Sequence, residues 1–281
     1  MIAEALSYPF FQRALIAGLL AAVACGVVGT FVVVRGIASI SGGLAHAAFG
    51  GVGLGYLAGF DPILGALGFG LASAIGVGVA EQRLKQGIDT LVAMVWAVGM
   101  AVGIVLIALA PGPEPDLMGY LFGNILFVPA RFLMLIAGMD LVIACLVILL
   151  FRRLEAVAFD EEFATVIGMR VGALSLLLLA LVAMTVVILI RVVGVILVLA
   201  LLTMPAAIAR HWTDALAPMM VLAAAVGAGC ITVGLFFSWM LASAFSADIP
   251  TGPAVILLTA IVYAASAALR HLLPARRPVT E

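Results

Sequence analysis

The chain is a succession of long apolar runs with mostly short connections. Each run has about 17–25 residues, the length that an α-helix needs to cross the hydrocarbon core of a bilayer. Hydrophobic residues make up 66% of the 281 residues and charged residues only 10%, whereas about a quarter of a soluble domain is charged. We therefore expect an all-α polytopic membrane protein. The runs are 13–34, 40–59, 62–80, 90–110, 129–151, 172–190, 193–210, 217–241 and 252–270.

One boundary between these runs is weakly marked. Only Arg191 and Gly194 interrupt the apolar residues between 172 and 210. One long or bent helix is therefore an alternative there, which would give eight spans instead of nine. The longest connection covers only residues 152–171, so we expect residues 1–281 to form a single transmembrane domain without an appended soluble domain.

Lys and Arg are distributed unequally between the two sets of connections. Ten lie on one side and three on the other, and the richer side of a membrane protein faces the cytoplasm. This predicts an external N-terminus and a cytoplasmic C-terminus, with the polar, turn-rich loops 111–116 and 246–253 outside. The ten are Arg35, Arg83, Lys85, Arg152, Arg153, Arg170, Arg210, Arg270, Arg276 and Arg277, and the three are Arg13, Arg131 and Arg191.

Several function classes are disfavoured by what the sequence lacks. The net charge of -1 gives no basic surface for nucleic acid. Cys25, Cys145 and Cys230 are isolated in apolar runs, so neither a disulfide framework nor a zinc knuckle is indicated. The N-terminus has no basic region of the kind that opens a cleaved signal peptide. There is no phosphate loop of the form GxxxxGK[ST], so ATP hydrolysis would need another chain.

The run 41–59 has the strongest packing signature. Small residues recur at every fourth position, which makes a smooth ridge on a helix and lets another helix approach closely. His46 lies about 60° around the helix from this ridge, at about 100° per residue. An imidazole inside the membrane indicates the wall of a permeation pathway, and the alternative is a histidine that hydrogen-bonds a neighbouring helix. The ridge consists of Gly43, Ala47, Gly51, Gly55 and Gly59.

Asp140 is the other ionisable residue deep in an apolar run. A carboxylate at that depth is costly, so we expect it to face a partner, water or a metal, and the alternative is a protonated or hydrogen-bonded carboxyl between helices. Imidazole and carboxylate together suit zinc or manganese. Two ligands are too few for a tight tetrahedral site, which is compatible with an ion that must leave again. We therefore predict His46 and Asp140 as the metal site.

Two stretches of the cytoplasmic side have the pattern of docking surfaces. In 156–170 an acidic turn precedes apolar residues at helical spacing. In 203–220 Pro205 and Pro218 bracket a short amphipathic segment. Ordinary interfacial helices, with Trp212 as a headgroup anchor, are the alternative for both. The residues predicted to make contact are Asp160, Glu161, Glu162 and Phe163 in the first stretch, and Met204, Pro205, Arg210, His211, Trp212 and Asp214 in the second.

Taken together, seven stretches resemble the permeases of the metal-ion family of ABC importers, which take up zinc, manganese or iron. They include GGLAHAAFGGVGLGY at 42–56, AVAFDEEFATVIGMRV at 156–171 and VVGVILVLALLTMPAAIAR at 192–210. The resemblance covers nearly the whole chain. The others are 10–36, 89–105, 120–126 and 249–257.

The resemblance implies a permease in a prokaryotic cell membrane, with a fold related to the vitamin B12 and siderophore permeases. It implies a homodimer or paired permease, two cytoplasmic ATPase subunits that bind ATP, and an external metal-binding lipoprotein. No cofactor is bound permanently, because the metal ion is the cargo. It also assigns ATPase coupling to the segment around 204–218, with 159–163 as a second cytoplasmic contact.

One position departs from the family pattern. The family has G-D-A-L-A-H-A where this chain has Ser41-Gly42-Gly43-Leu44-Ala45-His46-Ala47. The histidine is kept, but Gly42 replaces an aspartate four residues before it, which in the family shares one helix face with the histidine. Asp140 is a candidate to supply the missing carboxylate.

Other functions remain open at this point. The same machinery could move a chelated metal or an organic solute. An intramembrane enzyme would need convergent catalytic groups, for which His46 and Asp140 are the one candidate pair. A secondary transporter would favour inverted repeats and broken half-helices, which the sequence does not indicate.

Overall fold

The structure is a computed structural model that describes residues 2–84, 86–111, 119, 123, 125–245 and 250–273. In these ranges every regular element is a helix, and nine helices have 18 or more residues. Three short elements complete the described part: α1 (Ile2–Ala5), η1 (Ile125–Phe127) and α8 (Glu161–Val166). The nine are α2 (Pro9–Val34), α3 (Ala38–Ala58), α4 (Pro62–Leu84), α5 (Ile88–Leu109), α7 (Ala130–Phe159), α9 (Val171–Val193), α10 (Val195–Trp212), α11 (Leu216–Phe245) and α12 (Thr251–Leu272).

These nine helices correspond one to one with the predicted apolar runs. Eight of them are long and apolar enough to cross a membrane, and the ninth is α3, whose glycines and His46 lower its hydropathy. The alternative of one helix across 172–210 is wrong. Gly194 has a φ of 83°, a conformation that favours glycine, and it separates α9 from α10.

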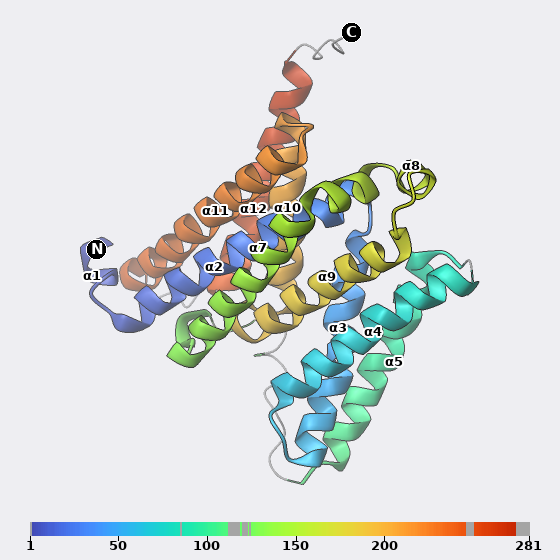
Figure 1. The fold of residues 1–281 in the computed structure, drawn as a ribbon. Coiled ribbons are helices and arrows are strands. Elements are labelled where there is room, and N and C mark those ends of the chain that lie inside the picture. Colours follow the sequence, from blue (N-terminus) through green and yellow to red (C-terminus); the bar gives the residue numbers. More distant parts are fainter. Residues whose placement is uncertain are drawn as a thin grey trace.

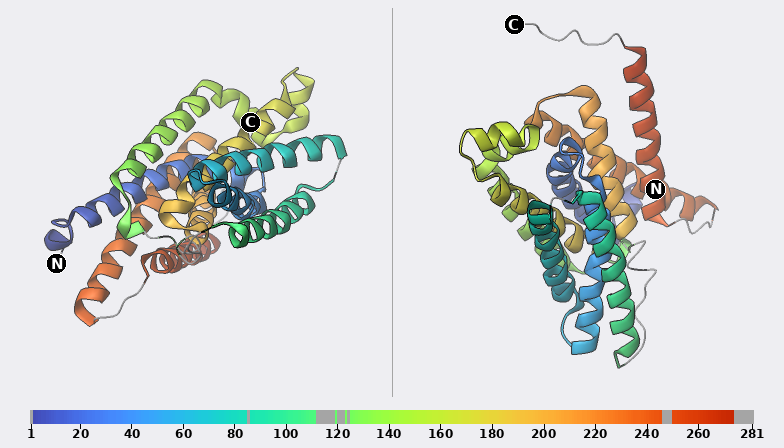
Figure 2. Two further views of the ribbon diagram at one scale, coloured as in Figure 1. Left: turned by 90° about the horizontal axis from the view of Figure 1, so that it is seen from below. Right: turned by 90° about the vertical axis from the view of Figure 1, so that its right-hand side faces the viewer.

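The bundle has a buried centre and an apolar periphery. In α2 and α9 about two thirds or more of the membrane-length window is buried (67% and 72%), but only 22% is buried in α5, α7 and α12. Figures 1 and 2 show α3, α4 and α5 gathered at one side of this centre. The exposed faces of the peripheral helices carry large apolar side chains, as expected where a protein faces lipid.

The small-residue ridge lies where α3 meets its two neighbours. A Cβ atom built on Gly43 would lie 2.3 Å from Cγ1 of Val92 on α5, and one on Gly51 would lie 2.0 Å from the carbonyl oxygen of Gly65 on α4. A Cβ on Gly55 would lie 2.6 Å from Cα of Pro62. The backbones thus approach as closely as small residues permit. Gly59 differs from the others, because its φ of 73° ends α3.

Helix α7 continues past the predicted end of its apolar run. Arg152 and Arg153 lie within it, and it ends only at Phe159. Asp160 then terminates α7 and caps α8, since its Oδ1 accepts a hydrogen bond from the backbone N–H of Phe163 at 2.8 Å. This turn separates α8 from the bundle as a helix of its own (Figure 1).

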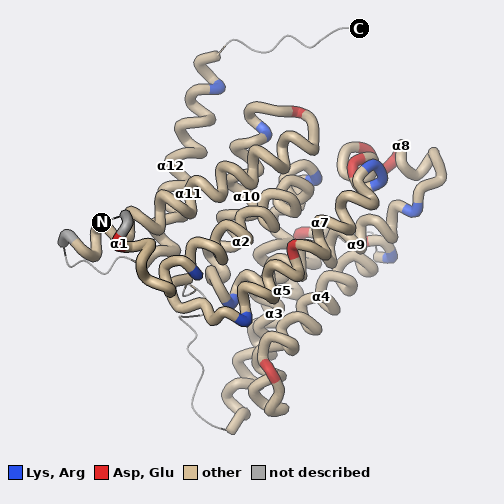
Figure 3. The backbone as a smooth tube through the Cα atoms, turned by 60° about the vertical axis from the view of Figure 1, so that its left-hand side comes forward, with Lys and Arg blue, Asp and Glu red and all other residues tan. Residues whose placement is uncertain are grey.

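Polar side chains join several helices at one end of the bundle. Gln82 of α4 bonds the backbone oxygen of Gly172 at 3.1 Å, and Ser39 of α3 bonds Asp89 of α5. Charged residues cluster around α8 at this end, while the helix interiors carry few (Figure 3). This is the end that carries the basic connections. Lys85, Arg276, Arg277 and most of the loops 111–116 and 246–253 lie outside the described residues.

Candidate functional site

His46 lies on α3 where this helix packs against α5. Its ring stacks on Trp96 of α5, with centroids 4.5 Å apart and an interplanar angle of 4°. The side chain is half-buried, and within the described residues no hydrogen bond engages its ring nitrogens. An imidazole that is held by stacking keeps its nitrogens available to a ligand.

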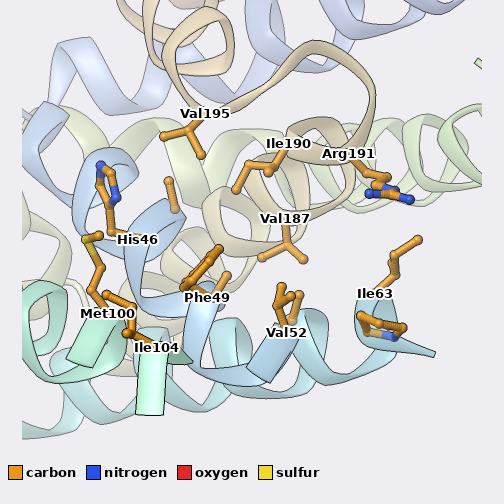
Figure 4. A pocket seen from close by; sticks show the side chains of 14 residues that line it. His46, Phe49, Val52, Ile63, Met100, Ile104, Val187, Ile190, Arg191 and Val195 are labelled. Atoms are coloured by element: carbon orange, nitrogen blue, oxygen red, sulfur yellow. The ribbon is translucent and has the colours of Figure 1, made fainter. Parts of the chain in front are cut away.

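A cavity of about 110 Å³ opens beside His46 among five helices. His46 lies at one end of it and Arg191 of α9 at the other, with apolar side chains between them (Figure 4). An imidazole and a guanidinium thus flank a cavity whose other lining side chains are apolar. Its lining is Ala45, His46, Ala48, Phe49, Val52, Pro62, Ile63, Ala66, Met100, Ile104, Val187, Ile190, Arg191 and Val195.

The structure does not bring the two predicted metal ligands together. Asp140 lies on α7, which packs against α2 and α9, and it does not line the cavity of His46. Neither of its carboxyl oxygens has a hydrogen-bond partner within the described residues. The described residues also contain no group of three or more His, Cys, Asp and Glu side chains that could hold a metal ion. Among the described residues, the lining of this cavity thus includes one imidazole, that of His46.

Gly42 is one turn from His46 and is buried. A Cβ atom built there would meet Leu199 at 3.8 Å and Trp96 at 4.0 Å, which are ordinary contact distances. Gly42 therefore differs from Gly43 and Gly51, where no side chain fits without movement. The structure thus leaves room for a Cβ atom at this position.

The predicted coupling segment at 203–220 spans the end of α10 and the start of α11. Pro205 is buried inside α10, and Pro218 lies in the first turn of α11. The segment is the last turns of α10, where Met204 is half-buried, followed by a turn that leaves Asp214 exposed. Local amphipathicity could not reveal that α10 continues without a break to Trp212.

The polar residues at the end of α10 bind neighbouring helices of the same chain. Arg210 donates a hydrogen bond to the backbone oxygen of Val33 at 3.0 Å. His211 and Trp212 both contact the hydroxyl of Ser266 on α12, at 3.0 and 2.9 Å. These side chains thus hold α10 against α2 and α12.

Helix α8, in contrast to the end of α10, exposes its apolar side chains. Phe163, Val166 and Ile167 are 58%, 83% and 50% exposed, so its apolar side chains point away from the bundle. Glu161 forms an ion pair with Arg35, and only Ala164 is buried. Arg35 was not among the predicted site residues, although a lone arginine between two apolar runs could have indicated it.

The long apolar helices and the imidazole beside an internal cavity are typical of a membrane-embedded transport protein. The comparison with protein families agrees. The chain belongs to the ABC 3 transport family, whose model matches residues 7–270. It is therefore a multi-pass transport subunit rather than an enzyme, and the resemblance seen in the sequence is confirmed.

Two relatives match most of this chain. An uncharacterized membrane protein of Synechocystis is 42% identical and covers 95% of this chain and 93% of its own length. The manganese transport system membrane protein MntC of Listeria monocytogenes is 32% identical, with 92% of this chain and 90% of MntC covered.

Two solved structures share the fold. PsaBC from Streptococcus pneumoniae, in complex with a Fab, has a TM-score of 0.81 at 31% identity and covers 95% of each chain. An inward-facing metal-chelate type ABC transporter has a TM-score of 0.69 at 20% identity, with 92% of this chain and 86% of that chain covered. The predicted fold class, an all-α transmembrane bundle of the ABC permease type, is thus confirmed.

Proposed function

We propose that this chain is the permease of an importer that moves divalent transition metal ions, zinc or manganese, into the cytoplasm. The observation that carries this is His46, a metal-ligand side chain beside a cavity between the helices of an ABC 3 family member. The name of MntC as a manganese transport protein supports the cargo. An ATPase subunit and an external metal-binding protein complete the importer.

His46 binds the passing ion as a neutral imidazole in this proposal. One imidazole per chain is too few ligands for a zinc or manganese site. A second, identical permease related by a two-fold axis supplies a second imidazole, which favours a homodimer. A site with so few ligands holds the ion weakly, as passage requires.

The two candidate metals are supported by different observations. Zinc is favoured by the donor type, because imidazole suits zinc and the carboxylate that would suit manganese is missing at Gly42. Manganese is favoured by the name of MntC. Both metals therefore belong in every transport assay.

The main ATPase contact in this proposal is α8 rather than the end of α10. Phe163, Val166 and Ile167 offer exposed apolar surface beyond the bundle, whereas Arg210 and Trp212 bind neighbouring helices. Because α8 belongs to the end with the basic connections, this end faces the cytoplasm. The N-terminus is then outside and the C-terminus inside.

Deleting the gene tests the proposal in the cell. We expect the zinc or manganese content of the cells to fall and to recover when the intact gene is returned, and we expect the chain to purify with an ATPase subunit. Unchanged content of both metals under metal limitation, with the chain removed, would contradict the proposed cargo.

A further inference from the structure

Arg35 occupies the corner between α2 and α3. It follows the last residue of α2, the chain reverses at Gly36 with a φ of 68°, and α3 begins at Ala38. Its side chain is only 13% exposed. An arginine so well covered needs partners for its guanidinium.

Those partners come from two other elements. Arg35 forms an ion pair with Glu161 in the first turn of α8, and its Nη1 donates to Oγ of Ser175 on α9 at 3.2 Å. The Ser175 hydroxyl in turn donates to Oε1 of Glu161 at 3.2 Å. The three side chains close a ring of charge-assisted hydrogen bonds between α2, α8 and α9.

The side chains around this ring favour an arginine over a lysine as the residue between α2 and α3. Glu81 of α4 acts on the same guanidinium, and it opposes the lowering of the pKa of Arg35 that burial causes. Arg35, Glu81, Glu161 and Ser175 line one cavity of about 430 Å³ at this end of the bundle. A planar fork can reach a carboxylate and a hydroxyl together, which a lysine cannot do as well.

The corner that Arg35 holds leads directly to His46. His46 lies eight residues after the start of α3, or about 12 Å along the helix at about 1.5 Å per residue. The start of α3 is also bonded to α5 through Ser39 and Asp89, and α5 carries Trp96, which stacks on His46. Both aromatic rings of the site thus belong to helices that are joined at this end.

We propose that Arg35 is a positioning residue of the transport cycle, which carries movements of α8 through Glu161 to the corner between α2 and α3 and so to His46. This inference rests on the proposed function, in which α8 contacts the ATPase. The link consists of continuous contacts: α8 to Glu161, Glu161 to Arg35, and Arg35 through Gly36 to α3. Removing it leaves the ATPase docked but weakens its hold on the helix that carries the ligand.

The test measures metal ions transported per ATP hydrolysed by the complete importer in proteoliposomes, with zinc and manganese as probes. Arg35→Gln and Glu161→Ala are expected to lower this ratio by roughly 2- to 30-fold, the range in which residues along a coupling route act, while ATP hydrolysis continues. The double variant is expected to lose no more than the stronger single variant, because both remove one link. Arg35→Lys is expected to fall between wild type and Arg35→Gln.

Arg152→Gln is the matched control. Arg152 lies at the same end of the bundle, but its side chain is 92% exposed, and its one ion pair among the described residues is with Glu155 of α7, at 3.7 Å. Arg152→Gln should transport as many metal ions per ATP hydrolysed as wild type does. Ser175→Ala removes the bridging hydroxyl alone. If Arg35→Gln does not assemble, the transport ratios of Ser175→Ala and Arg35→Lys test the role of Arg35 in its place.

An unchanged ratio in the assembled variants, or single losses that multiply in the double variant, overturns the role of Arg35. If wild type transports neither metal, the proposed function falls and this inference falls with it. If wild type transports metal, and the Arg35 and Glu161 variants transport as many ions per ATP as Arg152→Gln does, this inference alone is overturned.

Discussion

Replacing Gly51 by alanine tests whether the small-residue ridge holds α3 against α4. The new Cβ would lie 2.0 Å from the carbonyl oxygen of Gly65, about 1.4 Å short of ordinary contact, and the atoms that it meets are backbone. The two helices must therefore separate. Such overpacking costs about 1–3 kcal/mol, against a gain of about 0.5–1 kcal/mol from replacing a helical glycine.

Gly42→Ala provides the matched control on the same helix. Its Cβ meets Leu199 at 3.8 Å, so only the gain in helix propensity applies. We expect the two variants to differ by about 2 kcal/mol, or roughly 4–8 °C in apparent melting temperature at about 2–4 °C per kcal/mol. Thermal unfolding of the purified proteins in one detergent, at one scan rate, measures this difference. Equal melting temperatures for Gly51→Ala and Gly42→Ala would refute the close-packing argument.

Four further outcomes are expected. His46→Ala should lower metal uptake at least tenfold per assembled complex. Uptake by wild type should fall as the pH falls, because a protonated imidazole cannot bind a metal. Normal uptake of both metals by His46→Ala excludes the ligand role. Gly42→Asp should tighten binding of manganese, measured by equilibrium dialysis, since the Cβ fits and a carboxylate is added; unchanged affinity argues against a site at this turn. Phe163→Ala with Ile167→Ala should weaken copurification of the ATPase, whereas Leu141→Ala, on the lipid-facing side of α7, should not; equal effects would deny α8 its docking role. The purified chain alone should not hydrolyse ATP, and activity in a preparation free of a second subunit would contradict the division of labour.

The sequence predicts the helices well because each must be long and apolar to cross the membrane. Gly194 marks the one unclear boundary correctly, since glycine is the residue that tolerates the turn between α9 and α10. The end of α7 is different. Its last two turns carry charges and leave the apolar run, and only the cap at Asp160 stops the helix.

The site is predictable only where a single helix decides it. The place of His46 at the edge of the ridge follows from helical spacing, but its separation from Asp140 depends on how α7 packs, which no local pattern contains. The same holds for the two docking candidates. Both α8 and the end of α10 are amphipathic, and only the tertiary hydrogen bonds of Arg210, His211 and Trp212 distinguish them.

In the proposed function this chain carries metal ions across the membrane on energy supplied by another subunit. Uptake of radioactive zinc and manganese into proteoliposomes that contain the permease, its ATPase and the external binding protein measures this transport. We predict uptake of at least one metal that requires all three components and ATP on the ATPase side. Uptake without ATP, or ATP hydrolysis by the full assembly with neither metal accumulating, would contradict the account.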